Sequence, residues 1–300
     1  MKKVLLSLLA VLMATVSYAA PAKLDVVASF SILSDLTREV GGDRVNVYSL
    51  VPAGQDAHVY QPTPSDIKKV KTAQVFVSNG LGFEGWQSRI LGAANFKGRL
   101  VTTSTGVVPP KPSKSHGHHG DHDHDHEIDP HAWHNPQNVV IYVNNIAKGL
   151  SLADAAGATY YQARAAAYIK KVQALDTWAQ QQYKSLRPEQ RKVLTSHDAF
   201  SYLGSRYGIQ FIAPQGLSTE AEPTAKVVAQ LIQKVKKEKI KAVFLEYASN
   251  EKLLTQMSKE ANVTIGGILY ADSLTKAGGE ADTWLKFFEL NTKRLVAAMK

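Results

Sequence analysis

Ten histidines and no cysteine define the metal chemistry open to this chain of 300 residues. Without thiolates, a metal ion must be held by imidazole nitrogens and carboxylate oxygens, and a cysteine nucleophile and a disulfide framework are both excluded. Six histidines lie close together and alternate with aspartates: His116, His118, His119, His122, His124 and His126. Such a tract favours overlapping weak sites for zinc, copper or nickel. A solvated loop without bound metal is the alternative interpretation.

The histidine tract does not match the motifs of metallohydrolases. The segment 122–126 reads HDHDH and lacks the Asp-His pair of an HxHxDH motif, and the sequence contains no HExxH. A helical zinc site of the protease kind is therefore not indicated.

The other four histidines are more widely spaced, at His58, His131, His134 and His197. His58 follows a predicted strand that ends at Val51, and His197 follows another. Ligands of open α/β sheets bind beyond the carboxyl ends of the strands, so we expect the histidines at such ends to share one crevice. We expect His134 at the surface, with a supporting or alternative ligand role as the other possibility.

The elements that would position these residues alternate between short apolar runs and segments of helical periodicity. Strands are predicted at 24–30, 44–51, 74–78, 192–195, 210–213, 242–247 and 264–270. Helices are predicted at 32–40, 84–91, 158–184, 224–239, 251–260 and 281–299. This alternation indicates an α/β fold of two lobes with mostly parallel sheets, joined by a long rigid helix.

We divide the chain into a signal peptide at 1–19, an N-terminal lobe at 20–150, a linking helix at 151–187 and a C-terminal lobe at 188–300. Two lysines, an apolar run and small residues before Ala20 are typical of a secretory leader cleaved after about Ala19, with a membrane anchor as the alternative. The segment 112–128 is expected to be a histidine-rich loop of the first lobe. The net charge of +9 is scattered along the chain, so a nucleic-acid partner is not indicated.

Five motifs occur in order along the chain: 56–66 (DAHVYQPTPSD), 129–136 (DPHAWHNP), 196–208 (SHDAFSYLGSRYG), 244–246 (FLE) and 270–274 (YADSL). Together they resemble the periplasmic metal-binding proteins of zinc and manganese ABC transporters, of the ZnuA type. The resemblance implies an ion held between the lobes by His58, His131 and His197, with Asp272, a water or another carboxylate as fourth ligand. A helix N-cap is the alternative role of Asp272. The chain departs from the usual motif at Ala57 and Gln61, where the family generally has proline and glutamate.

The resemblance implies capture of zinc in the periplasm and its delivery to a membrane permease. Manganese-specific members carry a carboxylate where His197 stands, and three imidazoles with one carboxylate suit zinc better than manganese. A carrier of manganese or another divalent metal, and a metal-binding adhesin or buffer, are the alternatives. A zinc enzyme would need a placed base, for which Glu246 is the one candidate, and we expect Glu246 instead to orient a ligand imidazole. We therefore expect a monomeric binding protein and no enzyme. Because the sequence has no cysteine, we also expect that this protein carries no lipid anchor.

Overall fold

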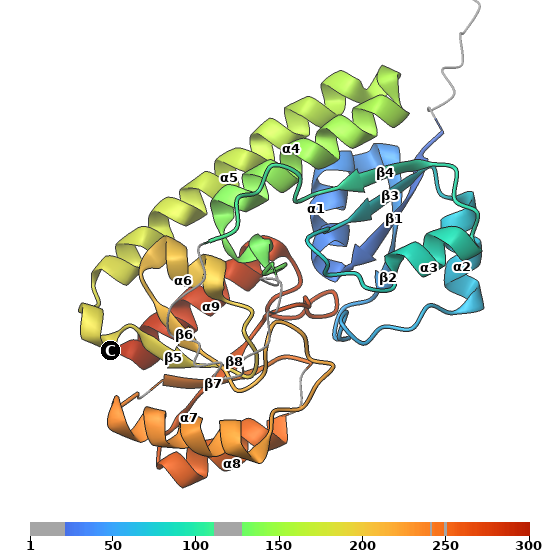
Figure 1. The fold of residues 1–300 in the computed structure, drawn as a ribbon. Helices are drawn as coiled ribbons and strands as arrows, with labels where there is room; N and C mark the ends of the chain where they lie inside the picture. Colours follow the sequence, from blue (N-terminus) through green and yellow to red (C-terminus); the bar gives the residue numbers. More distant parts are fainter. Residues whose placement is uncertain (1–21, 111–127, 241, 249–250) are drawn as a thin grey trace, which may run out of the picture.

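The computed structural model describes residues 22–110, 128–240, 242–248 and 251–300, and it has two α/β lobes (Figure 1). The predicted signal peptide and the six histidines of the tract lie outside the described residues, so those interpretations stay predictions. Each lobe is built on a sheet of four parallel strands. The predicted fold class is confirmed.

The first sheet has the strand order β2-β1-β3-β4. Its strands are β1 (Leu24–Phe30), β2 (Val45–Val51), β3 (Val75–Ser78) and β4 (Arg99–Thr102). Helices α1 (Ser31–Gly41) and α4 (Pro136–Ala153) pack against the sheet, and α2 (Pro64–Thr72) and α3 (Gln87–Ala93) lie beside it at the outer end of the lobe (Figure 1). The central strand β1 is almost completely buried, because a parallel sheet covered by helices needs continuous apolar runs.

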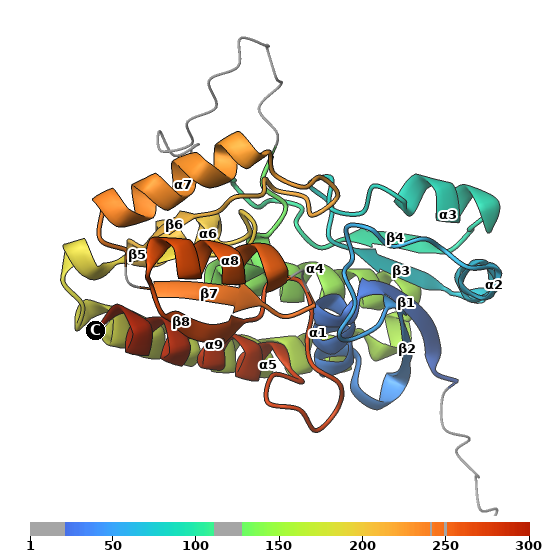
Figure 2. The same ribbon diagram turned by 90° about the horizontal axis from the view of Figure 1, so that it is seen from below.

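The second sheet repeats this arrangement with the strand order β6-β5-β7-β8. Its strands are β5 (Lys192–Leu194), β6 (Gln210–Ile212), β7 (Ala242–Glu246) and β8 (Ile265–Leu269). Its helices are α6 (Ser201–Tyr207), α7 (Ala225–Lys237), α8 (Glu251–Ala261) and α9 (Trp284–Met299). Figure 2 shows α7 and α8 on one side of this sheet and α9 on the other.

Helix α5 (Ala158–Lys184) runs along both lobes and packs against α1 and α4 of the first and α9 of the second (Figure 1). Its bounds agree with the predicted helix at 158–184. Its partner α4, together with α2 and β4, was not predicted from the sequence. Within the described residues, no helix is both long and apolar enough to cross a membrane.

One continuous core joins the two lobes. The Nε1 group of Trp133 donates a hydrogen bond to the Ala271 carbonyl (2.9 Å), and that of Trp284 donates to the Trp133 carbonyl (3.1 Å). All three side chains are buried. The two lobes therefore meet across a packed interface that limits how far they can separate.

Candidate metal centre

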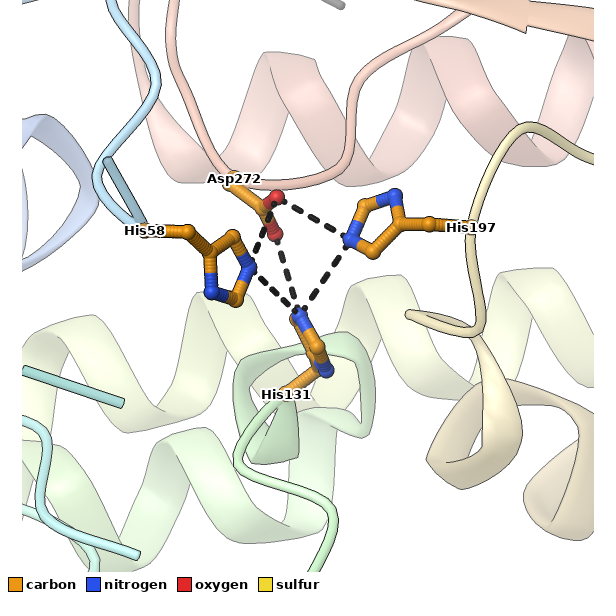
Figure 3. A group of neighbouring side chains, drawn as sticks. All are labelled: His58, His131, His197 and Asp272. Carbon is orange, nitrogen blue, oxygen red and sulfur yellow. Dashed lines mark hydrogen bonds and ion pairs between the residues drawn. The ribbon is translucent and has the colours of Figure 1, made fainter. Parts of the chain in front are cut away.

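Four side chains from the two lobes point toward one another at the lobe interface (Figure 3). They are His58, His131, His197 and Asp272, whose possible ligand atoms all lie within 4.8 Å of one another. His58 follows β2, whereas His197 and Asp272 follow β5 and β8. The three lie beyond the carboxyl ends of their strands, where parallel sheets place their ligand sites. His131 comes from the segment just before α4.

The separations within this group suit a small tetrahedral ion. The Nε2 atom of His131 lies 3.4 Å from those of both His58 and His197. The Asp272 carboxylate lies 3.5 Å from His58 Nε2, 3.5 Å from His131 Nε2 and 3.2 Å from His197 Nε2. Four ligands at about 2.0–2.1 Å from a zinc ion form a tetrahedron with edges of about 3.3–3.4 Å. These five separations are close to such edges, and all ligand atoms lie within 4.8 Å of one another, so the group has the size of a site for a divalent metal.

All four side chains are shielded from water. Their exposed fractions are 9% for His58, 0% for His131, 1% for His197 and 9% for Asp272. The ring of His58 also packs edge-on against Phe83, with centroids 4.8 Å apart. Clustered lone pairs in such a dry site are costly unless a cation or a proton lies between them.

The charges within the site are strongly coupled. Burial alone would raise the pKa of Asp272, but His197 and His131 outweigh it and hold this pKa well below its usual range. Burial alone would lower the pKa of His197, but Glu246 and Asp272 raise it well above the usual value. In addition, the buried Oδ1 atom of Asp272 accepts no hydrogen bond within the described structure. An anionic oxygen is thus available to a cation.

Two further carboxylates hold ligand imidazoles from behind. Glu246 accepts a hydrogen bond from His197 Nδ1, and it also accepts from the backbone N–H groups of Ser196 (2.7 Å) and His197 (3.1 Å). Asp129 accepts from His131 Nδ1 at 2.8 Å. A carboxylate at Nδ1 fixes the tautomer that directs the Nε2 lone pair toward a metal. The orienting role expected of Glu246 is consistent with this geometry.

Asp129 was missed by the sequence analysis as a functional residue. Burial alone would raise its pKa, but hydrogen bonds and charge from His131, with a further bond from Ser201, lower it. The available sequence signal was its position two residues before a candidate ligand, since aspartate in such a turn accepts hydrogen bonds from the residue two positions on.

The surface position expected for His134 is wrong. Its side chain is fully buried, and its ring lies 4.5 Å from that of Phe200 and 5.4 Å from that of Phe287, centroid to centroid. Neither ring nitrogen has a hydrogen-bond partner in the part of the chain that the structure describes. Burial lowers the pKa of His134 to about 3, so the imidazole is a neutral member of the aromatic core. It does not join the metal-ligand group.

A shallow cleft leads from the surface to this group. It is bordered by Asp56 of the first lobe and by His197, Thr219, Tyr247 and Asp272 of the second. The site is thus an enclosed set of N and O donors, shared by two lobes and bordered by a cleft. These features define a two-lobed binding protein for a divalent metal ion.

Comparison with known proteins identifies the family. The family model described as "Zinc-uptake complex component A periplasmic" (ZnuA) matches residues 26–298, and the chain belongs to this family. Its members are solute-binding components of ABC uptake systems rather than enzymes.

Individual relatives agree with the family but differ in their metals. The manganese ABC transporter substrate-binding lipoprotein PsaA of Streptococcus pneumoniae is 31% identical over 98% of this chain and 95% of its own. The Mn-bound periplasmic metal-binding protein from Candidatus Liberibacter asiaticus is 30% identical, with a TM-score of 0.81 over 93% of this chain and 100% of its own. The periplasmic zinc-binding protein TroA of Treponema pallidum shares the fold, with a TM-score of 0.84 at 24% identity over 93% of this chain and 99% of its own.

Proposed function

We propose that the chain captures zinc ions in the periplasm, after removal of residues 1–19, and delivers them to the permease of an ABC transporter. The donor set carries this proposal, with His58, His131, His197 and Asp272 as the ligands. Three imidazoles and one carboxylate at tetrahedral spacing suit zinc, whereas manganese prefers more oxygen ligands and a higher coordination number. The ion is the cargo of this protein, so the site needs no open position for chemistry.

Manganese is the second candidate cargo. It is favoured by the names of the relatives, since both PsaA and the Liberibacter protein are described with manganese. If manganese is the cargo, the residue at the position of His197 does not decide which metal a member of this family carries.

Competition between the two ions tests the choice through the comparison of the wild type with a variant, because sites of nitrogen and oxygen ligands generally bind zinc more tightly than manganese. We expect the purified protein without residues 1–19, given equal zinc and manganese under chelator-buffered conditions, to retain zinc by a large margin in elemental analysis. His197→Glu replaces an imidazole with an oxygen ligand, so it should weaken zinc binding and raise the relative share of manganese. A wild-type protein that retains mainly manganese would overturn the zinc assignment and leave the transport role intact.

A second variant tests the site itself. His58→Ala removes a ligand from the first lobe, so it should abolish tight binding of either ion. Asp43→Asn is a suitable control, because Asp43 is exposed and precedes β2, whereas His58 follows the other end of that strand. Tight binding that survives His58→Ala would place the site elsewhere and remove the basis of the proposal.

A further inference from the structure

Both ligand histidines of the first lobe are preceded two residues earlier by an aspartate, in the segments Asp56-Ala-His58 and Asp129-Pro-His131. In each segment, the aspartate Oδ1 accepts a hydrogen bond from the backbone N–H of the histidine, at 2.9 Å in both cases. The same local turn therefore fixes the backbone of both ligand histidines at their N–H groups.

The second oxygen of each aspartate binds a hydroxyl group from the other lobe. Ser201 at the start of α6 donates to Asp129 Oδ2, and the neighbouring Tyr202 hydroxyl donates to the Asp129 carbonyl at 2.9 Å. Because α6 begins four residues after His197, this contact ties His131 to the segment that carries a ligand of the second lobe.

The second contact lies at the mouth of the cleft. Thr219 of the second lobe donates from Oγ1 to Asp56 Oδ2 at 2.7 Å, and both residues border the opening above the site. The two aspartates thus form a pair of interlobe clasps: Asp129–Ser201 next to His131, and Asp56–Thr219 at the cleft.

We propose that the two clasps are positioning devices that couple separation of the lobes to release of the ion. This inference rests on the proposed function. When the lobes part, both hydroxyl bonds break, and each aspartate that holds a ligand histidine loses its second anchor. Closed lobes therefore keep His58 and His131 in place, and a partner that separates the lobes loosens them at the same time.

The test measures how fast the ion leaves rather than how tightly it binds. Co²⁺ is the probe, because its visible spectrum reports the ligand arrangement, and its release into excess chelator can be followed by stopped flow. The variants are Ser201→Ala and Thr219→Val, which remove the hydroxyl donors without touching a ligand. Thr219→Ser keeps the donor and serves as the rescue, and Ser205→Ala is a matched control on the exposed side of α6.

Loss of a hydrogen bond to a charged acceptor can change the rate of ion release by roughly tenfold or more. We expect Co²⁺ release roughly tenfold faster in each clasp variant, faster still in the double variant, and unchanged in Thr219→Ser and Ser205→Ala. The spectrum of the bound ion should remain that of the wild type. If Ser201→Ala does not fold, Thr219→Val carries the test, because Thr219 is only half-buried on a loop.

Two results would overturn the inference. One is release at the wild-type rate from both clasp variants, and the other is release from Thr219→Ser as fast as from Thr219→Val. Failure of the proposed function is seen separately, in a wild-type protein that does not bind Co²⁺ or in binding that survives His58→Ala, and it would remove this inference as well.

Discussion

A buried carboxylate at the lobe interface makes the stability of this protein depend on pH. Asp35 on α1 accepts a hydrogen bond from the backbone N–H of Trp284, at the start of α9 in the other lobe (2.7 Å). Its exposed fraction is 8%. Burial raises its pKa from 3.8 to about 7; the Trp284 bond and Arg38 oppose this rise, and the charges of Glu39 and Asp282 add to it. The buried Tyr168 of α5 also faces this group.

The sign and size of the effect follow from proton linkage. Between pH 3.8 and about 7, the unfolded chain ionises Asp35 while the folded protein keeps the proton, so the free energy of unfolding falls as pH rises. A pKa difference of this size corresponds to roughly 4 kcal/mol, developed fully above pH 7. This is a large part of the 5–15 kcal/mol that stabilises a typical domain.

Urea unfolding of the metal-free protein at pH 5 and pH 8 measures this effect. Asp35→Asn keeps an oxygen acceptor for the Trp284 N–H but cannot ionise, so we expect its free energy of unfolding, relative to wild type, to rise by roughly 2–3 kcal/mol between the two pH values. The control Asp43→Asn changes an exposed carboxylate, so its free energy of unfolding should change between the two pH values by the same amount as that of the wild type. If the free energy of unfolding of Asp35→Asn also changes by this amount, Asp35 titrates normally and the reasoning is refuted.

Three other predictions concern the metal site. Glu246→Gln removes the negative charge next to His197 Nδ1 and should weaken zinc binding by about 10- to 100-fold. Chelator competition measures this affinity, and an unchanged affinity would contradict the orienting role of Glu246. Zinc affinity should fall steadily from pH 8 to pH 5, because the raised pKa of His197 lets protons compete over this whole range; a flat profile in calorimetry would contradict ligation by three histidines. Deleting residues 116–126 should remove only weak zinc sites from the titration, and loss of the tight site would contradict separate sites.

The parts of this fold that could be predicted are those governed by local pattern. β1 and α5 follow from continuous apolar residues and from helical spacing, and both have the bounds that the sequence predicts. The positions of His58 and His197 at strand ends follow from the same pattern. The rule that parallel sheets bind ligands at one edge accounts for His197 and Asp272 on the second sheet, whereas their convergence with His58 of the first sheet was implied only by the family resemblance.

The parts that could not be predicted depend on tertiary contacts. Helix α4 contains the β-branched run Val139-Val140-Ile141, which does not favour a helix, and only the cap at Asn135 and the proline that follows it mark the start. The burial of His134 depends on Phe200 and Phe287, which are far away in the sequence. Likewise, nothing local indicates that Ser201 and Thr219 reach aspartates of the other lobe.

The placement of the ligands shows why small movements suffice for release. Each lobe supplies two of the four residues, so neither lobe can hold the ion alone. α5 packs on both lobes and a single core crosses the interface, so wide opening would break many buried contacts. Zinc sites tolerate changes in ligand distance of only about 0.2 Å. A lobe shift of about 1 Å would exceed this tolerance several times over. We therefore expect a docking partner to release the ion by a small displacement of one lobe, without unfolding the interface.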